Sequence, residues 1–194
     1  KATAARETLT RYGVLAGREV VVFTTDDAAY LAAADLAGAG ARVTLVDARA
    51  ELPAERARAC TEAGVTVTAD ATVVGSDGDA AGRVSAAHVA TGDGTEVLAC
   101  DLLLVSGGWT PTAHLFSHVR GQLVYDAGLG AFRPGAAIAG TEVIGAANGT
   151  LDLAGCLSEG AGGDAPSSAP EPARTPGLVL WRTAGDSSRQ FVDI

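Results

Sequence analysis

Two acidic residues, Asp26 and Asp27, lie between the apolar run Val20–Phe23 and a stretch rich in alanine and leucine. A strand, a turn and a helix in this order can hold a phosphate, because glycines in the turn let the backbone approach it and the helix N-terminus carries about half a positive charge. Here side chains block that approach, and two carboxylates repel an anionic ligand. We interpret the turn as a vacated nucleotide site in which Asp26 or Asp27 satisfies the helix end.

The alternative interpretation is an ordinary helix, capped by an acidic residue, that never bound a cofactor. It would also leave this turn without a ligand. Asp47 ends the next apolar run, Val43–Val46, at the position of a ribose-binding acid in nucleotide-binding βαβ units. Because the phosphate turn is lost, we interpret Asp47 as a strand-end carboxylate.

A second candidate turn lies in the segment EVIGAANGTLDL, residues 142–153. The pattern predicts a strand that ends at Ile144, a turn open to close backbone approach, and a helix that begins near Leu151 with Thr150 as its cap. This geometry aims free N–H groups at a ligand on the carboxyl edge of a sheet. The predicted cofactor-binding residues here are Gly145, Ala146, Asn148, Leu151 and Leu153. A plain strand–turn–helix joint is the alternative interpretation.

A third candidate is the segment SGGWTPT, residues 106–112. Gly107 and Gly108 allow a sharp bend, and Pro111 restricts its exit. Trp109 could shield a ligand, although a tryptophan in a core or a subunit interface is the commoner case. We add Gly107 and Trp109 to the cofactor-binding candidates.

The segment HLFSH places His114 and His118 one helical turn apart, a spacing that metal sites use. No third ligand accompanies them at a suitable spacing, so we predict no metal site. No Ser-His-Asp arrangement or pair of catalytic carboxylates can be assembled either, and we predict no catalytic residue in this chain.

Positioning these candidates requires a layered α/β scaffold. Strand, helix and strand within about 30 residues form one βαβ crossover. Two turn clusters, at 77–79 and 92–94, separate alternating runs typical of a β-meander. We predict a Rossmann-like α/β fold of the FAD/NAD(P)-binding type, with a parallel sheet and a β-meander. The expected helices cover 3–16, 28–39, 55–63 and 151–157, and the expected strands cover 20–23, 43–46, part of 64–75, 83–89, 96–98, 102–105 and 142–144.

Composition restricts the function classes. The chain has 194 residues, of which 47% are hydrophobic, so it can bury a core, and its net charge of −9 argues against binding to nucleic acid or an anionic membrane. No apolar run reaches the ~20 residues of a membrane span. The 3 cysteines are far apart in the sequence and favour a reducing, cytoplasmic setting. Methionine is absent and the chain begins with Lys1, so we expect an internal piece of a longer polypeptide.

Four stretches together carry a resemblance to a known family: residues 11–49, LLLVSGGWTPTAHLFSH at 102–118, VIGAANGTLDLAGCLSEG at 143–160, and FVDI at 191–194. In this order they resemble the alpha subunits of heterotetrameric sarcosine oxidases, which are similar to flavoprotein reductases of the pyridine nucleotide-disulfide type with two dinucleotide-binding domains. The resemblance implies a connecting helix at 1–17, an inserted NAD(P)-binding-like domain with its meander at 18–100, and a return to the first dinucleotide-binding domain at 101–160. A linker at 161–176 and a segment at 177–194 would then lead to a missing folate-binding domain.

The resemblance also implies a function. A sarcosine oxidase demethylates sarcosine to glycine with O2 and tetrahydrofolate, and yields hydrogen peroxide and a one-carbon folate. This chain would contact NAD. FAD and FMN would lie in the beta subunit and at its interface, and tetrahydrofolate would lie in the missing domain. The partners would be the beta, gamma and delta subunits, with the amine substrate handled elsewhere in the complex. Related flavoproteins carry an acid after the glycine of the second turn, whereas Ala146 and Ala147 stand here, which fits a site no longer used for flavin.

Three alternatives stay open from the sequence. The chain could belong to a related amine or proline dehydrogenase, or to an NAD(P)H-dependent flavoprotein reductase, although the latter needs the glycine-rich turn that Thr24–Asp27 lacks. It could also be a scaffold without catalytic function.

Overall fold

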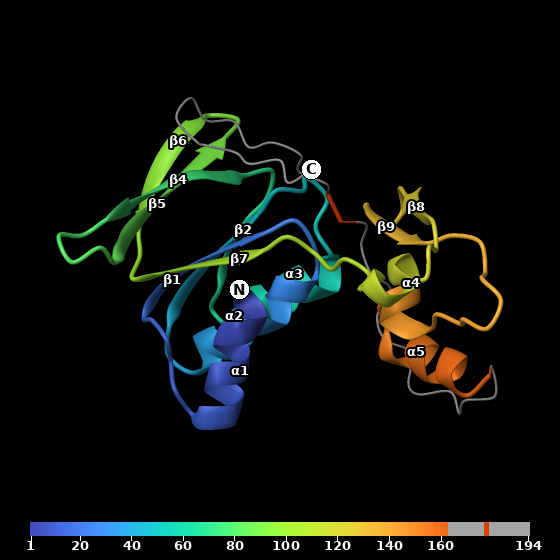
Figure 1. Cartoon of the computed structure of the whole chain (residues 1–194). Coiled ribbons are helices and arrows are strands. Elements are labelled where there is room, and N and C mark those ends of the chain that lie inside the picture. The colour runs from blue at the N-terminus through green and yellow to red at the C-terminus, as the bar shows by residue number, and fades with distance from the viewer. Residues whose placement is uncertain (163–176, 179–194) are drawn as a thin grey trace. The chain divides into compact units, whose positions relative to one another are not determined.

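A computed structural model describes residues 1–162 and 177–178, and it divides into two compact units (Figure 1). The first unit comprises Lys1–Gly108 together with Gly177 and Leu178, and the second unit begins at Trp109. Most of the predicted linker and of the predicted segment 177–194 lies outside the described residues. Among the described residues, no helix has both the length and the apolar character needed to cross a bilayer.

The first unit is built on a parallel sheet of four strands in the order β3-β2-β1-β7. In this sheet Val22 of β1 lies between Leu45 of β2 and Leu104 of β7. The continuous apolar runs form these strands because both faces of the sheet are covered. The strand bounds are Glu19–Thr24 for β1, Arg42–Asp47 for β2, Thr66–Thr68 for β3 and Leu102–Ser106 for β7.

Helices cover one face of this sheet and a β-meander covers the other (Figure 1). Val20, Val22 and Leu45 pack against the helices, whereas Val21 and Phe23 pack toward the meander. The helices are α1 (Ala2–Tyr12), α2 (Ala28–Gly38) and α3 (Ala54–Glu62). The antiparallel meander has the order β4-β5-β6, with β4 at Thr72–Gly78, β5 at Val84–Thr91 and β6 at Gly94–Ala99. The predicted fold class, parallel sheet plus meander, is confirmed.

The second unit consists of short elements. A two-stranded hairpin, β8 with β9, follows helix α4, and a short 3-10 helix η1 precedes helix α5. Among its described residues, the buried hydrophobic side chains are only Ala113, Phe116 and Ala131. The bounds are His114–His118 for α4, Leu123–Asp126 for β8, Ala131–Pro134 for β9, Gly145–Asn148 for η1 and Leu153–Gly160 for α5.

The structure differs from the sequence prediction in three places. The predicted strand at 142–144 is wrong: no strand forms there, and its neighbour Thr141 makes only an isolated bridge with Ile138. The hairpin β8–β9 was not predicted. Strand β7 pairs with β1 along its length, so the residues from 101 to Gly108, which were expected to begin the return segment, complete the sheet of the first unit.

Candidate functional site

The turn after β1 is filled by its own side chains. The Oδ1 atom of Asp26 accepts a hydrogen bond from the backbone N–H of Ala28 at 3.0 Å, in the first turn of α2. The hydroxyl of Thr24 accepts from the N–H of Asp26 at 3.2 Å, and the hydroxyl of Ser106 on β7 donates to Oδ1 of Asp26 at 3.4 Å. The prediction that an acidic side chain satisfies this helix end is confirmed for Asp26, which takes the place a phosphate would need.

Asp27 belongs to a buried network of charges. Its Oδ1 atom accepts from Arg49 Nη1 at 2.9 Å, and Arg49 Nη2 donates to Asp47 Oδ2 at 2.7 Å. The hydroxyl of Tyr30 donates to the same Asp47 oxygen at 2.7 Å. The side chains of Arg49 and Asp27 are each 6% exposed, and that of Asp47 is 0% exposed. Arg49 therefore lies between two carboxylates that the fold has removed from water, and the Nε of Arg56 adds a longer ion pair to Asp27 Oδ2 at 3.7 Å.

The pKa values in this network follow from burial and charge. Burial, the hydrogen bond to Asp47 and the charge of Asp47 all raise the pKa of Tyr30, so its hydroxyl stays protonated. Burial by itself lowers the pKa of Arg49, but Asp47 and Asp27 outweigh it and raise that pKa. Tyr30 and Arg49 thus both keep the protons that they donate to Asp47.

Asp47 is the strand-end carboxylate that was predicted, as the last residue of β2, and the structure adds its partners Arg49 and Tyr30. A ribose hydroxyl at this place would have to displace Arg49 or Tyr30, and it would leave a buried charge without its partner. Sequence reasoning missed Arg49, although an arginine two residues after the strand-end acid was the available signal.

The second candidate turn, at residues 145–150, is also occupied by a side chain of the same chain, that of Glu159. The N–H of Gly145 donates to Glu159 Oε2 at 2.6 Å, and the hydroxyl of Thr150 donates to the other oxygen of Glu159. The side chain of Asn148 also bonds Glu159. The structure therefore brings Gly145 and Asn148 of the predicted site together around a carboxylate of α5. The expectation that this turn presents a free N–H is wrong for Gly145.

Helix α5 begins later than predicted, and Thr150 does not cap it. Asp152 is the N-cap, and its Oδ1 atom accepts from the N–H of Gly155 at 2.7 Å. A glycine is needed at 145 because its φ of 63° lies in the left-handed region. A Cβ at this residue would also approach the Sγ of Cys156 to 3.4 Å.

The remaining predicted contact residues differ in exposure. Leu153 is 67% exposed and Trp109 and Ala146 are exposed, whereas Leu151 is half-buried. Gly107 is exposed and ends the first unit with Gly108, which takes the left-handed φ of 88° that the bend requires. Ala146 and Leu153 thus present apolar surface from the same turn–helix segment that holds Glu159.

Histidines 114 and 118 are the first and last residues of α4. Within the described part of the chain, no group of three His, Cys, Asp or Glu side chains is placed to hold a metal ion. Among the described residues, His114 and His118 therefore have no further side chains beside them that could complete a metal site.

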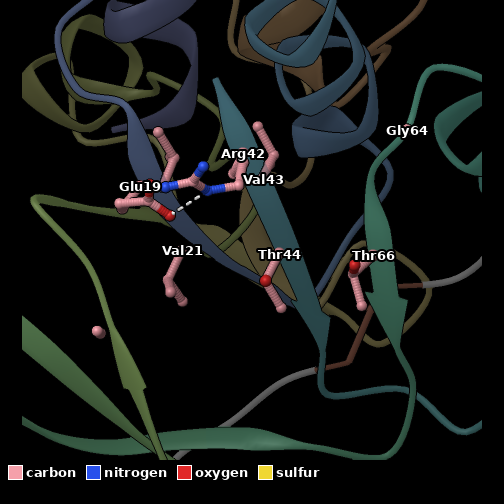
Figure 2. Close-up of a pocket in the computed structure, with 9 residues that line it drawn as sticks. Glu19, Val21, Arg42, Val43, Thr44, Gly64 and Thr66 are labelled. Carbon is pink, nitrogen blue, oxygen red and sulfur yellow. Dashed lines mark hydrogen bonds and ion pairs between the residues drawn. The ribbon is translucent and has the colours of Figure 1, made fainter. Parts of the chain in front are cut away.

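A cavity of about 300 Å³ lies at the start of the strands of the first unit (Figure 2). Glu19 and Arg42, the first residues of β1 and β2, form an ion pair at its rim, and the side chains of Thr44 and Thr66 lie further along it. Open α/β sheets bind ligands at the carboxyl ends of their strands, and this cavity lies at the opposite ends. Its charged rim residues are already paired, so we do not assign it as the nucleotide site.

The contact between Glu159 and the bend predicts a dependence on pH. The hydrogen bonds from Thr150 and Gly145 lower the pKa of Glu159 below its ordinary value of 4.5. The stabilisation is therefore present above that ordinary value and is lost as the pH falls through the lowered pKa. The protection of the Gly145 amide, measured by NMR relative to the intrinsic exchange rate at each pH, is expected to fall in this acid range. In the Glu159→Gln variant this acid step should be absent; a step of equal size there would contradict the assignment.

Comparisons with known proteins show that the sequence of this chain is similar to one group of enzyme subunits. No family model matches it. It is 41% identical over 162 residues to the sarcosine oxidase subunit alpha of Corynebacterium sp. strain U-96, covering 80% of this chain and 17% of that subunit. It is 42% identical over 166 residues to the same subunit from Corynebacterium sp. strain P-1, covering 82% of this chain and 17% of that subunit. The chain thus spans a small part of the length of the curated relatives it matches.

A solved structure supports the fold independently. The thioredoxin reductase of T. acidophilum superposes with a TM-score of 0.50 at 15% sequence identity, and the match covers 68% of this chain and 48% of that chain. At this identity the likeness shows the fold alone, a layered α/β arrangement.

Proposed function

We propose, from the homology of this chain to the alpha subunits of sarcosine oxidases, that it is an assembly segment of such a subunit and contributes one wall of an NAD site. It supplies no catalytic residue of its own. In the parent complex, sarcosine is oxidatively demethylated to glycine with O2 and tetrahydrofolate, giving hydrogen peroxide and a one-carbon folate. FAD and FMN lie in the beta subunit and at its interface, tetrahydrofolate lies in another domain, and gamma and delta subunits complete the assembly in the cytoplasm.

The observation that carries this proposal is the uncovered apolar surface of the second unit. Both clusters of buried hydrophobic residues belong to the first unit. In the second unit, Leu115 is 85% exposed, Leu153 is 67% exposed and Leu157 is 50% exposed. Exposed apolar side chains in this number mark a surface that another protein segment or a ligand covers. The second unit therefore serves as one layer of a larger domain.

We assign the NAD contact to the second unit because side chains already fill the turn of the first unit where a nucleotide would bind. At the first turn, Asp26 already holds the helix end and Arg49 is bound between Asp27 and Asp47. At the later bend, Glu159 takes the N–H of Gly145, so this donor is not free for the pyrophosphate. We infer that Ala146 and Leu153 supply an apolar wall for the nucleotide, and that its phosphates are bound by groups outside this chain.

Two additions to the purified parent complex test the proposal. Sarcosine is expected to produce hydrogen peroxide and to bleach the flavin absorbance, whereas NADH is expected to leave that absorbance unchanged within the same time. NAD should appear in the supernatant after acid denaturation, in about one equivalent per alpha subunit. Rapid bleaching by NADH would favour a flavoprotein reductase, and absence of sarcosine-dependent peroxide would favour a scaffold or a dehydrogenase for another secondary amine, such as proline.

A further inference from the structure

The vacated turn of the first unit is contacted by a distant part of the same chain. The backbone N–H of Leu178 donates to the carbonyl of Thr25 at 2.9 Å. At Gly177, the position of a Cβ would be 3.7 Å from the Cβ of Asp26 and 3.5 Å from the carbonyl oxygen of Thr25. Gly177 and Leu178 also belong to the first unit. Gly177 and Leu178 therefore meet the two residues that stand where a nucleotide would approach.

The backbone N–H and C=O groups of Thr25 both have hydrogen-bond partners. The N–H of Thr25 donates to the carbonyl of Ser106 on β7 at 3.1 Å, and the carbonyl of Thr25 accepts from Leu178. A Cβ at Gly108 would lie 3.3 Å from Asp26 Oδ2, so the end of the β7 segment also approaches the turn closely. The turn is thus enclosed by Gly108 and Gly177, and its N–H and C=O groups have partners in the chain.

We propose that the Thr25–Asp26 turn is an intramolecular docking site, and that its occupant is the Gly177–Leu178 segment of this chain. The site recognises backbone, through the hydrogen bond from Leu178 to Thr25, and a Cβ at Gly177 would make ordinary van der Waals contact with the turn. Docking closes the nucleotide edge of the first unit and anchors the chain to that unit after it leaves the second. This role is independent of the NAD wall proposed above, because it uses residues of the first unit only.

A designed disulfide tests the docking directly. The distance of 3.7 Å between Cβ positions at Asp26 and Gly177 matches the mean of about 3.8 Å found in disulfides. The double variant Asp26→Cys, Gly177→Cys, made in the full-length polypeptide, is expected to form the cross-link under mild oxidation. The matched control is Gly38→Cys, Gly177→Cys: Gly38 is exposed at the opposite end of α2, about 15 Å along the helix. Mass spectrometry of non-reduced peptides should show at least a tenfold excess of the cross-link in the first variant.

Equal cross-linking in the two variants, or none in the first while its circular dichroism matches the parent, would overturn the proposal. Because Asp26→Cys removes the acceptor of the Ala28 N–H, a second measurement uses the unaltered protein. Hydrogen exchange of the Leu178 amide is expected to be at least tenfold slower than in an unstructured peptide of the same sequence. Exchange at the peptide rate would also reject the docking site, even if the double variant fails to fold.

Discussion

Replacement of Arg49 by methionine is expected to lower the free energy of unfolding of the first unit by about 3–5 kcal/mol. The methionine keeps much of the side-chain volume but removes the cation shared by Asp27 and Asp47, which are 6% and 0% exposed. Asp47 would then be buried with only the hydroxyl of Tyr30 among the side-chain donors described above, and Asp27 would keep only the longer ion pair to Arg56. Urea denaturation of the chain, followed by far-UV circular dichroism, measures the change.

Two further variants separate a lost charge pair from a general loss of packing. Arg58→Ala is the matched control, since the Arg58 side chain on α3 is 76% exposed, and it should change stability by less than about 0.5 kcal/mol. Adding Asp27→Asn and Asp47→Asn to Arg49→Met removes the unpaired charges and should restore a large part of the lost stability. A loss below about 1 kcal/mol for Arg49→Met would show that the network does not hold this edge of the sheet.

Replacement of Leu153 by glutamate is expected to weaken NAD binding by the parent complex at least tenfold. Leu153 is 67% exposed in this chain, so the substitution should change the stability of the chain alone by less than about 0.5 kcal/mol. In the proposed NAD wall the same residue is covered, and a carboxylate there is both desolvated and close to an anionic ligand. NAD retained after gel filtration, set against the parent complex, measures the effect.

Leu31→Glu supplies the control for that experiment. Leu31 is 50% exposed on α2 of the first unit, where we propose no ligand, so NAD retention should change less than about twofold. Equal retention in the Leu153→Glu variant and the parent would contradict the wall at α5. Equal losses in both variants would point to a general effect of added negative charge.

The strands in the core of the first unit were predictable because each is a continuous apolar run in the sequence. Val20–Phe23, Val43–Val46 and Leu102–Val105 are continuous apolar runs, and such runs form strands only when both faces of a sheet are covered. Val143 and Ile144 carry the same signal but form no strand. A strand needs a neighbour to pair with, and the described part of this chain pairs none with that segment.

The sequence by itself determined that an acidic side chain would satisfy the helix end at the first turn, because the position of Asp26 just before α2 is local to that turn. Only the tertiary structure decided which side chains close the two candidate sites. The β1–α2–β2 crossover brings Arg49 to Asp27, and α5 brings Glu159, near its C-terminal end, back to Gly145. Such pairings depend on how the elements pack, and the free energy of a buried charge then selects the partner within reach.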